Sequence, residues 1–206
     1  MIDRYALPLV ARALAPPARA LAARGVRADA VTLAGFAVGM AAPVLIWAGF
    51  TLAALAAIAA NRIADGLDGM IARLNGPTDR GAFLDIALDF VFYAAVPLGF
   101  ALADPAANAL PAAVLICAFV GTMSSFLAFS VVAGQRGMRP AAYPTKGIYY
   151  LGGLTEGAET IAVMAAMCLW PAAFPWLAYG FAAACLVTTL TRWHMGWTAF
   201  RPSDRS

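Results

Sequence analysis

Apolar stretches, each long enough to cross a bilayer as a helix, follow one another through most of this chain. A membrane-spanning helix needs about 20 mostly apolar residues. Because 63% of the 206 residues are hydrophobic and only 12% are charged, a soluble domain of this composition would lack the polar surface to cover its core. The chain is therefore expected to be an all-α, polytopic membrane protein with six transmembrane helices.

Turn-forming residues divide the apolar stretches. Reversals are expected at Gly49, in the Asn-Gly-Pro-Thr segment of residues 75–78, at Asp104-Pro105 with Asn108, and between Pro171 and Pro175. The six spans are then predicted at residues 31–47, 52–74, 80–102, 110–133, 146–170 and 176–200. Together, residues 31–200 form one transmembrane domain, and residues 201–206 form a short cytoplasmic tail.

The first 30 residues have a different pattern and are expected to form an N-terminal amphipathic arm at the membrane interface. Ile2, Tyr5 and Leu9 recur at helical spacing with arginines beside them, as in helices that lie in the plane of the interface. The Pro16-Pro17 pair is expected to interrupt this helix, because proline removes a backbone donor and its ring clashes with the preceding turn.

Basic residues gather at alternate reversals, whereas the reversals at Gly49, Asp104 and Pro171 contain none. Because positive charge stays on the cytoplasmic side during insertion, both termini are expected to be cytoplasmic, in a bacterial-type inner (cell) membrane. The same placement assigns the isoelectric point near 9.0 to a membrane surface and not to nucleic acid. The residues concerned are Arg4, Arg12, Arg19, Arg24, Arg27, Arg73, Arg80, Arg136, Arg139, Lys146, Arg192, Arg201 and Arg205.

Four aspartates lie inside the second and third predicted spans, where charged residues are costly and usually functional. Asp65 and Asp68 are three residues apart and Asp85 and Asp89 are four apart, so each pair lies on one helix face. If the two helices reverse near Pro77, all four carboxylates meet roughly 12–18 Å of helix rise from the turn. The spacing predicts one site at the cytoplasmic side of a helical hairpin.

Clustered carboxylates need compensation, since one like-charged pair at about 4 Å repels by roughly 4 kcal/mol at an effective dielectric of about 20. Oxygen ligands without histidine or cysteine nearby favour a hard cation such as Mg²⁺, Mn²⁺ or Ca²⁺. Two such ions would suit displacement at phosphorus, because they clamp the phosphate oxygens. The site is thus expected to be a divalent-metal site that acts on a phosphate.

Small residues beside the aspartates are expected to make room for a ligand. Gly66 and Gly69 each cost about 1 kcal/mol in a helix interior relative to alanine, which suggests that they are kept for access. Ala72 and Gly81 extend this small surface. Arg73, one turn after Gly69, is placed to bind a diphosphate.

The segment DGLDGMIAR of residues 65–73, followed by GAFLDIALD of residues 81–89, resembles the signature of the CDP-alcohol phosphatidyltransferase family at all eight defining positions. The resemblance implies transfer of a phosphatidyl group from a CDP-linked lipid to an alcohol, with release of CMP, in phospholipid biosynthesis. It also implies Mg²⁺ or Mn²⁺ as cofactor and a homodimer.

The resemblance further implies roles for individual residues. Asp65, Asp68 and Asp85 would ligate metal, and Asp89 would share a metal and act as the catalytic base. The family often has Pro-Asn before a threonine in the first span, whereas this chain has Ala28-Asp29 before Thr32. The residues expected around the nucleotide are Thr32, Asp68, Gly69, Ala72, Arg73 and Gly81.

Other polar residues leave alternatives open. Arg62 is a structural counter-ion of Asp65 or a phosphate ligand. Glu156 and Glu159 are a hydrogen-bonded packing pair, a dimer contact, or part of an acceptor site. An acceptor that bears a phosphate would meet cations, and one that bears an amine would meet these glutamates. The residues expected to line the acceptor site are Arg139, Lys146, Arg192, Glu156 and Glu159.

Two further function classes use acidic membrane helices. An intramembrane prenyltransferase usually has two aspartate motifs far apart, whereas this chain has all four aspartates on one hairpin. A divalent-cation transporter would need carboxylates along a path through the membrane. The sequence favours the phosphatidyltransferase and does not identify the acceptor alcohol.

Overall fold

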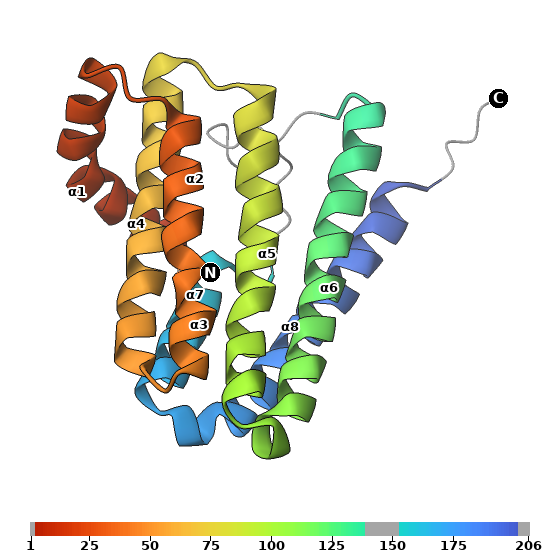
Figure 1. The fold of residues 1–206 in the computed structure, drawn as a ribbon. Helices are drawn as coiled ribbons and strands as arrows, with labels where there is room; N and C mark the ends of the chain where they lie inside the picture. Colours follow the sequence, from red (N-terminus) through yellow and green to blue (C-terminus); the bar gives the residue numbers. More distant parts are fainter. Residues whose placement is uncertain (1–2, 139–152, 202–206) are drawn as a thin grey trace.

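The computed structural model describes residues 3–138 and 153–201, and within these ranges the chain is helical and without strands (Figure 1). Predicted elements and observed helices agree closely in the first half of the chain. The helices are α1 (Asp3–Ala23), α2 (Ala28–Gly39), α3 (Ala41–Trp47), α4 (Thr51–Asn75), α5 (Asp79–Ala103), α6 (Pro105–Gln135), α7 (Gly157–Leu169) and α8 (Phe174–Ala199), with a 3₁₀ turn at Pro171–Ala173.

Within residues 3–138 and 153–201, four segments are long and apolar enough to cross a membrane: α2 with α3, α5, α6, and the 3₁₀ turn with α8. Helix α4 has 25 residues, but the charged residues of the site lower its hydropathy. Helix α7 has only 13 residues, short of a full span. The all-α membrane fold is confirmed, whereas the predicted number of six spans is not.

The hairpin of α4 and α5 matches the prediction almost to the residue. The two helices occupy Thr51–Asn75 and Asp79–Ala103. Gly76 between them has a φ of 96°, a left-handed conformation that glycine adopts without strain. Thr78 then caps α5, because its side chain accepts a hydrogen bond of 3.0 Å from the Gly81 backbone N–H.

The predicted break at Pro16-Pro17 is wrong, because α1 continues from Asp3 to Ala23. The two prolines cost the helix backbone donors, but α1 packs against α4 in this region. Leu14 faces Gly66 so closely that a Cβ on Gly66 would lie 2.5 Å from its Cδ1. Tertiary packing thus overrides the local proline signal at this point.

The predicted fifth span is also wrong at its start. Residues 153–156 are not helical, and α7 begins at Gly157. Glu156 and Glu159 form a capping box at that start, which fixes the helix boundary. The backbone N–H of Thr155 donates to Thr188 Oγ1 of α8 at 3.1 Å, so the preceding segment is tied to a neighbouring helix.

Asn108, expected in a reversal, lies inside α6 instead. Its amide donates to the Phe100 carbonyl at 3.1 Å, which ties the start of α6 back to the end of α5. Asp104 makes the reversal and caps α6 by accepting from the Ala107 backbone N–H at 3.1 Å.

Small residues bring the helices close together around the site, as is common in membrane bundles. On α2, a Cβ at Gly35 would lie 2.5 Å from Ala64 Cβ of α4. A Cβ at Gly39 would lie 2.8 Å from the Asn61 side chain. The apolar core continues towards the other end of the bundle, where Phe100 stacks on Phe174 with ring centroids 4.4 Å apart.

One end of the bundle gathers the connection from α1 to α2, the turn from α4 to α5, and the carboxyl ends of α6 and α8 (Figure 1). These are the reversals at which the sequence places its basic residues. The reversals without lysine or arginine, between α3 and α4 and between α5 and α6, lie at the opposite end. The arrangement agrees with the predicted separation of charge along the membrane normal.

Candidate active site

The hairpin brings the aspartates of α4 and α5 together as predicted. Oxygens of Asp65, Asp68 and Asp85 all lie within 4.8 Å of one another. These residues and Asp89 line one small cavity of about 10 Å³, with Thr32 of α2 at its edge. A volume of that size holds about one water-sized sphere. Three carboxylates thus converge on a space fit for a single small ion.

Asp68 provides an independent sign of a missing positive partner. The residue is buried, with 5% of its surface exposed. Its Oδ2 has no hydrogen-bond partner among the described residues. A buried carboxylate oxygen without a partner is strongly unfavourable. Because Asp65 and Asp85 stand beside it, a divalent cation fits the donor set better than a hydrogen bond.

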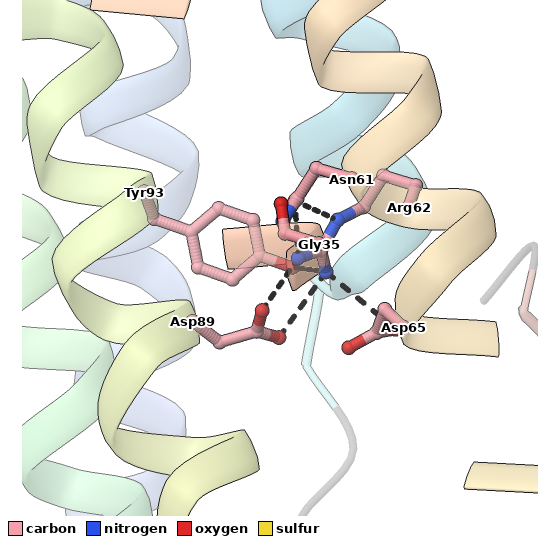
Figure 2. Close-up of polar contacts among 6 residues, drawn as sticks. All are labelled: Gly35, Asn61, Arg62, Asp65, Asp89 and Tyr93. Atoms are coloured by element: carbon pink, nitrogen blue, oxygen red, sulfur yellow. Dashed lines mark hydrogen bonds and ion pairs between the residues drawn. The ribbon is translucent and has the colours of Figure 1, made fainter. Parts of the chain in front are cut away.

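Arg62 pairs chiefly with Asp89, 27 residues further along the chain on the facing helix (Figure 2). Its Nη2 donates to Asp89 Oδ1 at 2.5 Å, and Nη1 donates to Oδ2 at 3.2 Å. Arg62 Nη1 also lies 3.7 Å from Asp65 Oδ2. Of the two interpretations left open for Arg62, the structure therefore supports the counter-ion, although its main partner differs from the one expected.

Two residues that the sequence analysis did not single out hold Arg62 in place. Asn61 Oδ1 accepts from Arg62 Nη2 at 2.6 Å, and the Tyr93 hydroxyl accepts from Nη1 at 3.0 Å. The Asn61 amide in turn donates to the Gly35 carbonyl at 3.0 Å (Figure 2). Helical spacing could have identified both residues, because Asn61 is one helical turn from Asp65 and Tyr93 is one turn from Asp89.

The residues expected at the nucleotide lie at the same end of the hairpin. A Cβ on Gly69 would come within 3.5 Å of Arg73 Nη1, so Arg73 and Gly69 share a face as predicted. A Cβ on Gly81 would lie 3.3 Å from Asp29 Oδ1. Ala72 is half-buried on the same helix. Gly66 does not belong to this surface, because it faces α1.

Asp29, which occupies the position where the family often has asparagine, forms an ion pair with Arg80. Arg80 Nε donates to Asp29 Oδ2 at 2.8 Å, which links the start of α2 to the start of α5. Thr32 donates its hydroxyl to the Ala28 carbonyl at 3.1 Å and borders the aspartate cavity. The start of α2 thus forms one wall of the site.

Of the residues expected at the acceptor site, the structure describes Arg192, Glu156 and Glu159. Arg192 Nη1 donates to the Thr122 carbonyl of α6 at 3.0 Å. Glu156 and Glu159 form the α7 capping box, which is consistent with the packing interpretation of this pair. Arg139 and Lys146 lie outside the described residues.

Comparison with known proteins identifies the fold and the reaction class. The family profile described as CDP-alcohol phosphatidyltransferase matches residues 26–195. The chain belongs to the CDP-alcohol phosphatidyltransferase family. As a member of this family it is a membrane transferase of substituted phosphate groups, which takes a CDP-linked lipid as donor and an alcohol as acceptor.

Relatives of this phosphatidyltransferase support the assignment. The Inner membrane protein YnjF of Escherichia coli (strain K12) is 47% identical over 205 residues, which cover all of both chains. A phosphatidylinositol phosphate synthase of Streptomyces avermitilis is 41% identical over 105 residues, which cover 50% of this chain and 43% of that enzyme. The first relative and the apolar helices together indicate an inner-membrane location.

Solved structures resemble the phosphatidyltransferase along nearly its whole length. The phosphatidylinositol phosphate synthase PgsA1 of Mycobacterium tuberculosis, solved with CDP-DAG bound, has a TM-score of 0.70 and 25% identity over 95% of this chain and 98% of that one. The same enzyme in complex with manganese and citrate has a TM-score of 0.69 and 25% identity, over 94% and 93%. The aspartate cluster is thus consistent with use of a divalent metal.

Proposed function

We propose that the protein transfers a phosphatidyl group from CDP-diacylglycerol to a phosphate-bearing alcohol and releases CMP, with the aspartate cluster of α4 and α5 as its active site. The observation that carries the proposal is the buried Asp68 oxygen without a described partner, directed into a cavity that Asp65 and Asp85 share. A divalent cation there, Mg²⁺ or Mn²⁺, would neutralise charge on the donor diphosphate and polarise its phosphorus.

The other residues of the hairpin would position the reactants. Gly69 and Ala72 leave space for the cytidine end of the donor, and Arg73 pairs with its diphosphate. Gly81 and Thr32 complete this nucleotide surface. Asp89 would take the proton of the acceptor hydroxyl as the general base while that oxygen attacks phosphorus and CMP leaves.

An apolar groove between α2 and α4 supports a lipid donor. The groove has a volume of about 380 Å³ and is lined by small or branched apolar residues, among them Val31, Ala34 and Ala64. Gly35 borders both this groove and the aspartate cavity. An acyl chain in the groove would therefore place its headgroup beside the carboxylates without leaving the apolar phase.

Two observations favour a phosphate-bearing acceptor over one that bears an amine. The glutamates that could bind an amine, Glu156 and Glu159, are engaged in the α7 cap. The relatives with named activities are phosphatidylinositol phosphate synthases. Arg192, together with Arg139 and Lys146, would then supply positive charge for the acceptor phosphate.

Kinetics with purified protein would test the acceptor class. CMP release from CDP-diacylglycerol is measured with a panel of free and phosphorylated alcohols, including inositol phosphate, glycerol phosphate, serine and choline. Arg192→Gln is expected to raise KM for the phosphorylated acceptor about tenfold, while Arg136→Gln serves as the matched control at the same end of the bundle. A faster reaction with an amine-bearing alcohol, whose KM rises in Glu156→Gln, would contradict the proposed acceptor.

The proposed function also includes an orientation in the membrane and a dimeric state. Both termini and the aspartate site would face the cytoplasm, in agreement with the basic residues at that end of the bundle. Labelling of single cysteines placed in the connections would test this orientation from each side of the membrane. The protein would act as a homodimer, and chemical cross-linking in native membranes would detect the pair.

A further inference from the structure

Residues 153–156 form a non-helical segment that precedes α7. Helix α7 then runs for 13 residues towards the reversal at Pro171, which lies at the end of the bundle without basic residues (Figure 1). A helix of that length rises about 20 Å, whereas the hydrocarbon core of a bilayer is about 30 Å thick. The segment therefore lies at membrane depth, where non-helical backbone is tolerated only if it is buried in protein or lines a water-filled cavity.

Thr188 of α8 anchors this segment. Its Oγ1 accepts one hydrogen bond of 3.1 Å from the Thr155 backbone N–H and another of 2.9 Å from the Thr155 hydroxyl. The same hydroxyl donates to the Ala184 carbonyl of its own helix at 3.1 Å. Both threonines are buried. Gly153 packs against the Thr188 methyl group so closely that a Cβ on Gly153 would clash with it. A single side chain thus fixes the segment to α8.

The junction between Thr155 and Thr188 lies level with the aspartate cluster. Asp65 and Thr188 are each 14 residues from the first residue of their helices. Helices α4 and α8 begin at the same end of the bundle (Figure 1), and this spacing corresponds to about 21 Å of helix rise. The anchored segment is therefore at the depth where an acceptor has to meet the carboxylates.

Arg192 lies one helical turn beyond Thr188 on the same face of α8. Its Nη1 donates to the Thr122 carbonyl of α6 at 3.0 Å, and its guanidinium carbon lies 5.9 Å from the centroid of the Phe126 ring. Helix α6 thus holds the Arg192 side chain, while Thr188 holds the segment. The cation proposed for the acceptor phosphate and residues 153–156 are consequently fixed relative to each other through one turn of α8.

We propose that Thr188 is a positioning residue for the acceptor: its hydroxyl holds residues 153–156 against α8, and the held segment forms a wall of the acceptor site next to Arg192. The inference rests on the proposed function and adds a residue to the acceptor side of that site. Thr188 acts through Thr155 and does not belong to the hairpin that holds the aspartates. Its loss therefore weakens acceptor binding and leaves the chemistry at phosphorus intact.

Steady-state kinetics of CMP release separates this role from a purely structural one. Purified protein in nanodiscs is assayed with CDP-diacylglycerol and the phosphorylated alcohol of the panel that reacts fastest. Thr188→Val keeps the shape of the side chain but removes the hydroxyl, so KM for the acceptor is expected to rise about tenfold, with kcat and the affinity for CDP within about twofold of wild type. Thr188→Ser retains the hydroxyl and is expected to keep KM within about twofold. Thr191→Val is the matched control, because Thr191 is exposed and its hydroxyl donates to the Val187 carbonyl of its own helix.

Two further variants keep the proposal testable if Thr188→Val does not fold. Gly153→Ala keeps the Thr188 hydroxyl but pushes the segment away from α8, and KM for the acceptor is expected to rise at least about threefold. Thr155→Val removes the hydroxyl bond and retains the backbone bond, so a rise of about threefold is expected. Gly180→Ala is the control for an added methyl group, because a Cβ there meets nothing within 4 Å in the described structure.

Three outcomes would overturn the proposal. A fall in kcat without a change in acceptor KM would show a structural role alone, because a misfolded fraction lowers the amount of active enzyme without altering acceptor binding. An unchanged KM in folded Thr188→Val, or in both Gly153→Ala and Thr155→Val, would exclude the anchor from the acceptor site. A KM that is raised equally in Thr188→Ser would exclude the hydroxyl as its cause. Absence of CMP release from the wild-type protein with every phosphorylated alcohol would contradict the proposed function and this inference with it, and it is seen before any variant is compared.

Discussion

Arg62 and Asp89 form an ion pair across the α4–α5 hairpin, with Arg62 Nη2 2.5 Å from Asp89 Oδ1. The pair joins the two helices that hold the whole aspartate cluster. The pair lies inside the bundle, away from the charged end of α4. Helix α4 can contain Arg62 there because the carboxylates on the same face compensate its positive charge. The same contact separates Asp89 from the three aspartates that converge on one another.

Divalent cations should stabilise the folded protein. Binding at Asp65, Asp68 and Asp85 relieves repulsion between carboxylates, and an ion at about 100 times its Kd adds about 2.7 kcal/mol to the free energy of unfolding. Thermal unfolding in detergent with increasing Mn²⁺ should therefore show a rising Tm. Asp68→Asn should remove most of this dependence. An equal rise in both proteins would place the stabilising ion elsewhere.

Loss of Asp89 should affect turnover more than acceptor binding. Asp89→Asn cannot take the proton of the acceptor, so kcat should fall about 10²–10⁴-fold while the KM of the acceptor changes little. Tyr93→Phe removes another Arg62 acceptor and leaves the carboxylate in place, so its kcat should fall by less than about tenfold. Steady-state CMP release measures both, and equal losses in the two variants would contradict the role of Asp89 as base.

The close contact between α2 and α4 should be sensitive to a single methyl group. A Cβ at Gly39 would lie 2.8 Å from Asn61, whose side chain is committed to Gly35 and Arg62. Gly39→Ala should therefore destabilise the protein by about 1–3 kcal/mol. Gly180→Ala is the control, because a Cβ there meets nothing within 4 Å in the described structure. A Tm for Gly39→Ala at or above that of the control would contradict the predicted clash.

Nucleotide affinity should depend on the open surface at Gly69. Gly69→Leu fills the space beside Arg73, so the affinity for CDP should fall at least about tenfold, equivalent to about 1.4 kcal/mol. Gly180→Leu introduces the same side chain on an open face of α8 and should bind CDP normally. Calorimetric titration of both variants with CDP in the presence of Mn²⁺ provides the comparison. Unchanged affinity in Gly69→Leu would remove this surface from the nucleotide site.

The site was predictable from sequence because its information is local to one hairpin. Helical spacing placed Asp65 with Asp68 and Asp85 with Asp89, and the turn at Gly76 fixed how the two pairs meet. The contact between Arg62 and Asp89, however, joins two different helices. Spacing along one helix indicated only Asp65 as a partner of Arg62. Such contacts depend on how far each helix is rotated about its axis. Sequence periodicity predicts that rotation only coarsely.

The errors in the fold have the same origin. Pro16-Pro17 predicts a break when α1 is considered alone, but packing of Leu14 on Gly66 belongs to the assembled bundle. The start of α7 depends on the bond from Thr155 to Thr188, 33 residues away. Apolar composition indicates that a helix forms but does not indicate where tertiary contacts make it begin.

The central claim is that the aspartate cluster carries out metal-dependent phosphatidyl transfer. The most direct measurement is release of CMP from radiolabelled CDP-diacylglycerol by the purified protein, with a phosphorylated alcohol present, before and after exhaustive chelation. The account predicts CMP release with Mg²⁺ or Mn²⁺, loss of at least about 100-fold on chelation or in Asp68→Asn, and recovery of the wild-type rate when metal is returned. Full CMP release after chelation, or an unchanged rate in Asp68→Asn, would contradict it.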